Sequence, residues 1–259
     1  MVEAWAEKRV VISPDPTTLA DSVAARLLNR VAKRLDSDAL VHISLTGGTM
    51  GSAVLVAASR HPRRDRIDWS RVHFWWSDER FVPRADDDRN EKQARAALLD
   101  ALDIPDANIH AIASSDDGVD LEGAAERYAA ELARFAGEDG DWPSFDVCFL
   151  GVGPDAHIAS LFPDRPEILI TDRSTVPVRE SPKPPPERVS VTRPVINSSQ
   201  RVWMVLSGAD KAAALGLALA GASYASVPAA GAKGRKRTVF FVDDAAAAQV
   251  PPELIDGEY

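Results

Sequence analysis

The chain alternates short apolar runs with longer amphipathic stretches, and this alternation constrains its fold more than any other feature. Apolar residues recur at helical spacing over 19–35 and again over 121–132, which predicts two amphipathic helices. The apolar runs are typical of strands, and we place them at 9–13, 40–45, 72–76, 146–150, 188–192, 201–206 and 238–242. We therefore predict an α/β fold with a doubly wound, mainly parallel sheet, helices on both faces and a small excursion around residues 164–190.

Composition bounds the class of protein and its partners. A hydrophobic share of 45% and a charged share of 27% over 259 residues are ordinary for a globular protein, so we expect one domain spanning residues 1–259. The formal charge of −9 disfavours a nucleic acid partner. Residues 1–9 are polar, and no apolar run reaches the ~20 residues of a membrane span. We expect no signal peptide, no membrane contact, a cytoplasmic location, and a monomer or a weak homo-oligomer.

Glycines and charged side chains follow the strand predicted at 146–150, at the edge where open parallel sheets bind ligands. Gly151 and Gly153 let the backbone turn sharply. Asp155 and His157 follow at once, and we expect them to begin a short helix. This turn is the best candidate for an active site.

Three other strands end in similar turns. Residues 46–49, Thr-Gly-Gly-Thr, precede a helical stretch, an arrangement that directs free amides and a helix dipole at an anion. Asp78 and Arg80 follow the strand at 72–76, and Lys211 follows the strand at 201–206. Because carboxyl ends of parallel strands share one edge, we predict a single composite site there.

Several classes of chemistry are disfavoured. The run from Gly151 to Ala156 matches the dinucleotide pattern G-x-G-x-x-A, but Pro154 lacks an amide donor for a pyrophosphate. The chain has no G-x-S-x-G elbow, no metal-binding histidine spacing, and one cysteine, Cys148, which we assign to the core of a protein from a reducing compartment. We expect no cofactor and no metal, and metal-free acid/base chemistry remains. His42 and His73 lie within predicted strands, where we expect core or rim residues.

The site turns resemble the 6-phosphogluconolactonase family, which is related to the glucosamine-6-phosphate deaminases. Residues 151–163 are similar to the family pattern G-x-G-x-D-G-H-x-A-S-L-F-P, with Ala156 in place of glycine, where we expect ordinary backbone dihedrals. Residues 78–83 with Asn90 resemble D-E-R-x-V-P followed by S-N, with Arg89 in place of serine. Further similar stretches lie at 46–51, 188–194, 211–212 and 227–230.

The resemblance implies a carboxylic ester hydrolase that converts 6-phosphogluconolactone to 6-phosphogluconate in the oxidative pentose phosphate pathway. His157 is the implied general base, since an imidazole titrates near neutral pH. Asp155 or Asp78 would orient it. The phosphate and the developing charge are assigned jointly to these groups: Thr46, Gly47, Gly48, Thr49, Arg80, Arg188 and Lys211. The sequence leaves open which basic group meets the phosphate and which the carbonyl.

Two alternatives remain, a deaminase or sugar-phosphate isomerase and a non-catalytic phosphosugar-binding module. The deaminases carry N-E-P soon after their H-x-A, whereas residues 161–163 here, Leu-Phe-Pro, contain no carboxylate, which favours the lactonase. We expect aspartates 86–88 to cap a helix over 90–102, and the proline-rich residues 165–187 to form an extended surface segment that covers the site.

Overall fold

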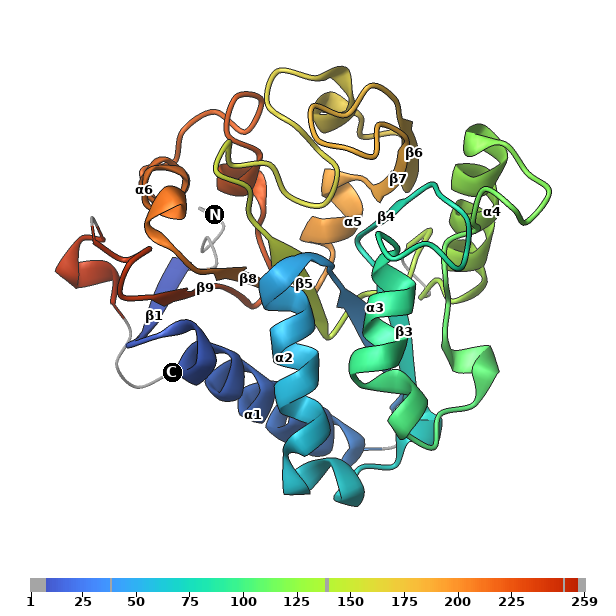
Figure 1. The fold of residues 1–259 in the computed structure, drawn as a ribbon, viewed down its shortest axis with the longest axis horizontal. Coiled ribbons are helices and arrows are strands. Elements are labelled where there is room, and N and C mark those ends of the chain that lie inside the picture. Colours follow the sequence, from blue (N-terminus) through green and yellow to red (C-terminus); the bar gives the residue numbers. More distant parts are fainter. Residues whose placement is uncertain (1–7, 38, 138–139, 249, 256–259) are drawn as a thin grey trace.

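The computed structural model describes residues 8–37, 39–137, 140–248 and 250–255, so most of the polar N-terminal stretch discussed above lies outside the described residues. A six-stranded sheet in the order β1-β9-β8-β5-β2-β3 forms the centre, and every pairing in it is parallel. Its strands are β1 Lys8–Ser13, β2 Val41–Leu45, β3 Val72–Trp76, β5 Val147–Gly151, β8 Arg201–Leu206 and β9 Arg237–Asp243. The predicted parallel α/β fold is confirmed (Figure 1).

Helices cover both faces of this sheet. The long helices α1 (Pro16–Leu35) and α2 (Gly48–Arg60) pack side by side on one face, where Arg26 of α1 lies over the Phe241 ring. Helix α4 (Leu121–Arg134) lies against the other face, since Tyr128 and Phe135 contact the Trp75 ring of β3. Side chains alternate between faces along a strand, so the apolar runs predicted from the sequence are buried on both sides.

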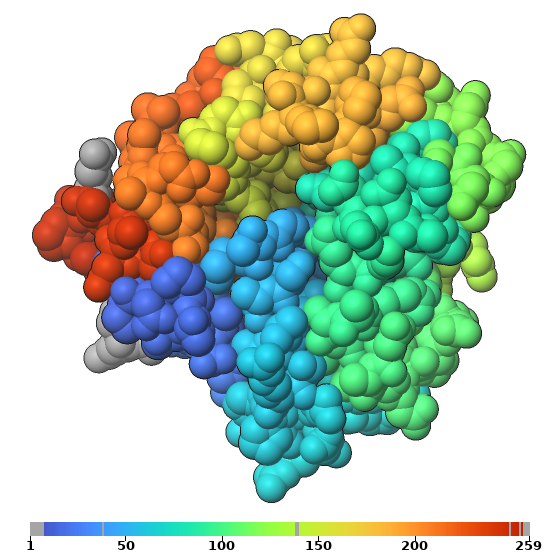
Figure 2. All heavy atoms as spheres, in the orientation of Figure 1, coloured from blue at the N-terminus to red at the C-terminus, as the bar shows by residue number. Residues whose placement is uncertain are grey.

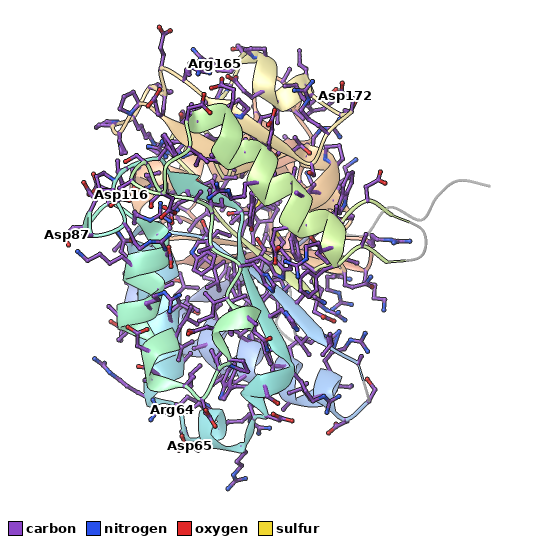
Figure 3. All side chains as sticks on the ribbon, turned by 90° about the vertical axis from the view of Figure 1, so that its right-hand side faces the viewer. Arg64, Asp65, Asp87, Asp116, Arg165 and Asp172 are labelled. Carbon is purple, nitrogen blue, oxygen red and sulfur yellow. The ribbon has the colours of Figure 1, made fainter. Side chains whose placement is uncertain are left out.

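A second, three-stranded antiparallel sheet lies beside the main one, in the order β4-β7-β6. Its strands are β4 Asp78–Arg80, β7 Arg188–Val191 and β6 Thr175–Val178. The excursion was predicted in the right place, but the proline-rich segment is not wholly superficial, because β6 is largely buried beneath α4 (Figure 3). Charged side chains such as Asp87, Asp116 and Asp172 point outward at the periphery.

The shorter helices are α3 Asn90–Ala97, α5 Arg193–Asn197 and α6 Ala212–Leu219. The expected capping of α3 by aspartates 86–88 is wrong. The buried Glu79 carboxylate accepts hydrogen bonds from the backbone N–H groups of Asn90 and Glu91, at 2.7 and 2.8 Å, and so caps the helix from β4. Helix α3 also ends early, because Leu98 has φ −147° and ψ −52°.

Cys148 is buried in β5, as expected of a core residue. In the described part of the chain, no helix combines the length and hydrophobicity that crossing a bilayer requires.

Candidate active site

A cavity of about 550 Å³ opens at the carboxyl ends of β2 and β5. These strands are neighbours, and the chain runs from β2 outward to β3 before it returns to β5, so the cavity lies where the strand order reverses. Figure 2 shows a hollow where the light blue, teal, yellow and orange segments meet. All of the site residues predicted from the sequence line the cavity except Asp155: Thr46, Gly47, Gly48, Thr49, Asp78, Arg80, His157, Arg188 and Lys211.

Asp155 is not among the lining residues but contacts the histidine that is. Its Oδ1 is 2.6 Å from His157 Nδ1. The other ring nitrogen, Nε2, is left for the cavity, which the His157 side chain lines. Burial disfavours the charged carboxylate, but the hydrogen bond and charge of His157 and the charge of Lys183 hold the pKa of Asp155 well below its ordinary range. An ionised Asp155 fixes the imidazole tautomer that carries its proton on Nδ1.

The loop that carries this pair is a turn, so the expected short helix is wrong. Ala156 has φ +64°, in the left-handed region, so the expectation of ordinary dihedrals at this position is also wrong. Ala156 is 2% exposed, and its amide donates to the carbonyl of Gly153 at 2.9 Å. The sequence suggested that Gly153 allows a sharp turn, whereas in the structure the position requires glycine because of the neighbouring histidine. A Cβ on it would lie 2.1 Å from His157 Nδ1, so only glycine leaves room for the imidazole against the backbone.

The double-glycine turn forms the floor of the cavity. Helix α2 begins at Gly48, and the first N–H groups of a helix have no intrahelical partner, so they are donors suited to an anion. Thr46 Oγ1 accepts a hydrogen bond from the Gly151 amide at 3.2 Å and thereby ties the turn to the end of β5. Gly47 packs against the Asn90 side chain, whose Oδ1 would lie 1.8 Å from an added Cβ.

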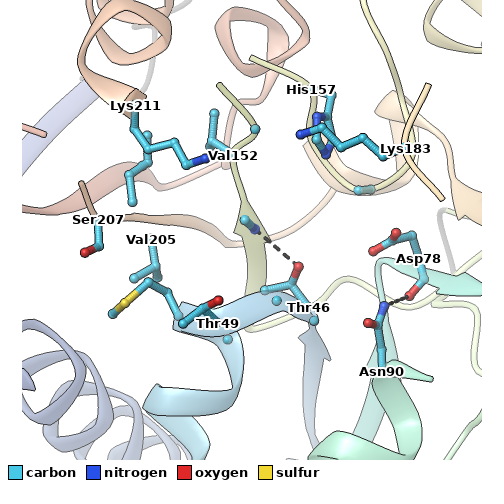
Figure 4. A pocket seen from close by; sticks show the side chains of 18 of the residues that line it. Thr46, Thr49, Asp78, Asn90, Val152, His157, Lys183, Val205, Ser207 and Lys211 are labelled. Atoms are coloured by element: carbon cyan, nitrogen blue, oxygen red, sulfur yellow. Dashed lines mark hydrogen bonds between the residues drawn. The ribbon is translucent and has the colours of Figure 1, made fainter. Parts of the chain in front are cut away.

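Lys211 and Ser207 lie on one side of the cavity, whereas His157 and Asp78 lie on the other (Figure 4). Lys211 Nζ is 2.9 Å from Asp210 Oδ2. Ser207 donates a hydrogen bond to Asp243 Oδ2 at 2.6 Å, which fixes the loop after β8. The cavity therefore has a lysine on the side of the helix terminus and an imidazole on the opposite side.

Asp78 and Arg80 belong to β4. The Asp78 carboxylate accepts a 2.7 Å hydrogen bond from Ser160 and lies 4.0 Å from Arg188 Nη1, so its described contacts are with these residues and the imidazole is held by Asp155. Arg80 Nη1 donates to the Asp88 carbonyl at 2.7 Å. Burial raises the pKa of the neighbouring Glu79 to about 7, against the charge of Arg89 and three backbone N–H bonds.

Arg188 lies at the start of β7, and its side chain is 4% exposed. Its Nε donates to the carbonyl of Pro185 at 3.2 Å, and its Nη2 donates to the carbonyls of Lys183 and Pro184 at 3.0 and 3.1 Å. Burial lowers the pKa of the guanidinium, and the Asp78 charge opposes that effect. Most of the donor capacity of Arg188 is therefore engaged by the backbone of the proline-rich segment.

Several lining residues received no role from the sequence: Met50, Asn90, Val152, Lys183, Ser207 and Asp210. Lys183 had a detectable signal, because it is the one charged residue within the run Pro-Lys-Pro-Pro-Pro at 182–186. The proline-rich segment was expected to cover the site, and Lys183 and Pro184 do line the cavity. Among the described residues, no three His, Cys, Asp or Glu side chains are grouped so that they could hold a metal ion.

A family model described as glucosamine-6-phosphate isomerases/6-phosphogluconolactonase matches residues 14–241. The chain belongs to this family. Members of the glucosamine-6-phosphate isomerase/6-phosphogluconolactonase family that are similar to it include the 6-phosphogluconolactonase of Streptomyces coelicolor, 45% identical over 95% of this chain and 96% of the relative. The 6-phosphogluconolactonase of Mycobacterium tuberculosis is 44% identical over 93% of this chain and 98% of its own. The crystal structure of the 6-phosphogluconolactonase from Thermotoga maritima superposes with a TM-score of 0.79 at 27% identity, covering 92% of this chain and all of that one.

Proposed function

We propose that this chain hydrolyses 6-phospho-D-glucono-1,5-lactone to 6-phospho-D-gluconate, the reaction named by its relatives and a step of the oxidative pentose phosphate pathway. The observation that carries this proposal is the His157–Asp155 pair, 2.6 Å apart, at a cavity that also presents a helix N-terminus and Lys211. One end supplies a general base and the other an anion site, which are the two functions that a phosphorylated lactone requires.

The geometry supports an orientation for the substrate that the sequence left open. The phosphate lies against the amides at the start of α2 and the ammonium of Lys211, with the hydroxyls of Thr46 and Thr49 nearby. The lactone carbonyl then faces His157 on the opposite side of the cavity. A protein with a formal charge of −9 needs such local cations, because its overall field opposes the entry of an anion.

The chemistry follows from this placement. His157 Nε2 takes a proton from water as the water oxygen bonds to the lactone carbonyl carbon, and the carbonyl oxygen becomes an oxyanion. The intermediate collapses when the bond from that carbon to the ring oxygen breaks, and protonated His157 returns the proton to the ring oxygen. The carboxylic acid of the product then loses its own proton to water. Asp155 holds the ring in position and stabilises its charged form between the two transfers.

The deaminase alternative requires a further acid/base residue near the substrate carbons. Residues 161–163, where the deaminases carry a carboxylate, contain the buried Leu161 and Phe162, with exposed fractions of 0% and 1%. Phe162 packs against the imidazole of His157, with ring centroids 4.6 Å apart. An apolar wall at this position supports the lactonase over the deaminase.

The proposal is tested by adding freshly prepared 6-phosphogluconolactone to the protein and following acid release in a weakly buffered solution. We expect release well above the spontaneous rate, and no release of ammonia from glucosamine 6-phosphate. Acid release at the spontaneous rate would contradict the proposal, and ammonia release would establish the alternative. Because the proposed steps use only side chains of this chain, we expect the rate to survive dialysis against a chelator.

A further inference from the structure

A short loop between β6 and β7, which we call the proline strap (residues 181–187), forms part of the cavity wall. Its ends are joined by a hydrogen bond from the Ser181 amide to the Pro186 carbonyl at 2.9 Å. The Lys183 amide donates to Ser181 Oγ at 3.3 Å. The strap is thus a closed loop with Lys183 near its tip.

Arg188 fixes the strap through hydrogen bonds to its backbone. Its three hydrogen bonds to consecutive carbonyls, those of Lys183, Pro184 and Pro185, fix the backbone that carries the lysine. A bond from a charged donor is stronger than one between neutral groups, and Arg188 is almost wholly excluded from water. The position of the Lys183 backbone is therefore set by Arg188, while the Lys183 side chain is 40% exposed.

The ammonium of Lys183 lies beside the proposed base. Its Nζ is 3.7 Å from Asp155 Oδ1, the same oxygen that pairs with His157 Nδ1. Figure 4 shows Lys183 next to His157 and across the cavity from Lys211. An ammonium has three donors, and this weak contact with Asp155 leaves donors of Lys183 free for a substrate.

The other cations that line the cavity make their described contacts with groups other than Asp155. Arg80 donates to the Asp88 carbonyl, and Arg188 holds the strap. Lys211 pairs with Asp210 on the side that we assign to the phosphate. Among the cations that line the cavity in the described structure, Lys183 is the one that pairs with the carboxylate holding His157, which places its ammonium close to the charge that forms there.

We propose that Lys183 is a further catalytic residue of the proposed lactonase reaction and that Arg188 positions it. The Lys183 ammonium donates a hydrogen bond to the lactone carbonyl oxygen and stabilises the negative charge that develops there as the water oxygen bonds to carbon. No proton leaves the lysine in this step, and its donor is released when the carbonyl re-forms. This role rests on the proposed function and on the orientation given above.

The test compares Lys183→Met, which removes the charge but keeps most of the stem, with Lys183→Arg and with Lys33→Met. Lys33 is an exposed residue of α1 and serves as the matched control. Loss of one oxyanion donor typically lowers kcat by ~10²–10³-fold. We expect a fall of this size for Lys183→Met with KM changed less than ~3-fold, partial recovery in Lys183→Arg, and no change in Lys33→Met.

The pH–rate profile separates catalysis from a purely electrostatic effect on the base. Asp155 of its own loop pairs with the His157 ring, and Lys183 of the strap pairs with Asp155. The other charged groups of the cavity lining are Asp78 and Arg80 from β4, Arg188 from β7, and Asp210 and Lys211 from the segment after β8. If Lys183 acted only through Asp155, its loss would displace the acidic limb and leave the plateau rate unchanged. That result would overturn the proposal, as would a rise in KM with unchanged kcat, which would place Lys183 at the phosphate.

Arg188 is tested in the same series by Arg188→Lys, which keeps a charge but lacks the planar guanidinium whose Nε and Nη2 reach the three carbonyls. If Arg188 acts through Lys183, the kcat of Arg188→Lys/Lys183→Met lies well above the product expected from two independent losses. Independent losses would overturn the positioning role. Normal wild-type hydrolysis with an unaffected Lys183→Met rejects only the role of Lys183, whereas an inactive wild-type protein rejects the function and the role with it.

Discussion

His157 and a cluster of three other histidines occupy opposite ends of the same sheet, and their surroundings differ in almost every respect. His157 follows β5 at the carboxyl edge and is held by Asp155 at an open cavity. His42 and His73 lie near the amino ends of β2 and β3, and His110 stacks on the Trp75 ring at a centroid distance of 3.8 Å. His73 Nδ1 is 2.9 Å from His110 Nε2, and His110 Nδ1 is 2.8 Å from Glu131.

The comparison shows how the surroundings decide what an imidazole does. Burial lowers the pKa of His42 to about 3 and that of His73 to about 4, with smaller contributions from neighbouring histidines. These rings are neutral near pH 7 and act as packing groups that also satisfy hydrogen bonds, such as the one from Trp75 Nε1 to His42 Nδ1 at 3.1 Å. His157 instead has a carboxylate partner on one nitrogen and a cavity on the other side, which suits proton transfer.

The largest expected effect comes from His157→Ala. We expect kcat for lactone hydrolysis to fall at least ~10²-fold, the usual share of a general base, with the melting temperature nearly unchanged. His73→Gln is the matched control from the buried cluster, and its kcat at pH 7.5 should stay within ~2-fold of wild type. A His157→Ala protein with full turnover would remove the distinction between the two ends of the sheet.

The next effect concerns the partner of the base. Asp155→Asn keeps the shape of the side chain but removes the charge that stabilises the imidazolium, so we expect kcat to fall by ~10- to 100-fold. Asp87→Asn provides the control, because the Asp87 side chain is 97% exposed on the loop after β4. Steady-state rates at saturating lactone measure both. Equal rates for wild type and Asp155→Asn would show that ring orientation alone suffices.

The buried cluster should reveal itself in the pH dependence of stability. An unfolded imidazole titrates near 6.5, whereas folded His73 and His42 titrate near 4 and 3, so the unfolded chain binds more protons between these values. Their contribution is complete above pH ~6.5 and is lost as pH falls, by up to ~1.4 kcal/mol per pH unit for each ring. Urea unfolding at pH 7, 6 and 5 measures the slope. We expect a smaller slope for His73→Gln, and an unchanged slope would mean that His73 does not titrate on unfolding.

The smallest effect is expected at Ala156. Glycine relieves the left-handed backbone at φ +64°, but the change also removes a buried methyl group worth ~0.8 kcal/mol and adds freedom to the unfolded chain. We expect Ala156→Gly to alter the free energy of unfolding by less than ~1 kcal/mol and kcat by less than ~2-fold. A large loss of activity would show that the methyl group itself supports the loop that carries His157.

The sequence predicted what depends on periodicity and on the ends of strands. Apolar runs located all six strands of the main sheet, and the turns after β2, β5 and β8 were found because glycine and charge there interrupt a regular pattern. Since parallel strands share one edge, their convergence on one cavity followed from topology.

Features that depend on tertiary contacts were not predicted. The left-handed conformation of Ala156 could not be predicted, because alanine favours the right-handed helix and gives no sign of a positive φ. The Glu79 carboxylate of β4 caps helix α3 through a tertiary contact that no local sequence pattern encodes. The sequence therefore led to the nearby aspartates as the predicted capping residues. The three bonds from Arg188 to the proline strap were not predicted either, because they depend on a loop that folds back over this residue.

The order of strands in the main sheet has a consequence for how activity is acquired. Thr46, Asp78, His157 and Lys211 are separated along the chain by long connections, and only the completed sheet, with the small sheet docked beside it, brings them around one cavity. We therefore expect turnover to return during renaturation only when the whole sheet has formed. The circular dichroism of the helices should recover before turnover does, so the recovered rate of hydrolysis reports how much of the protein has its complete sheet.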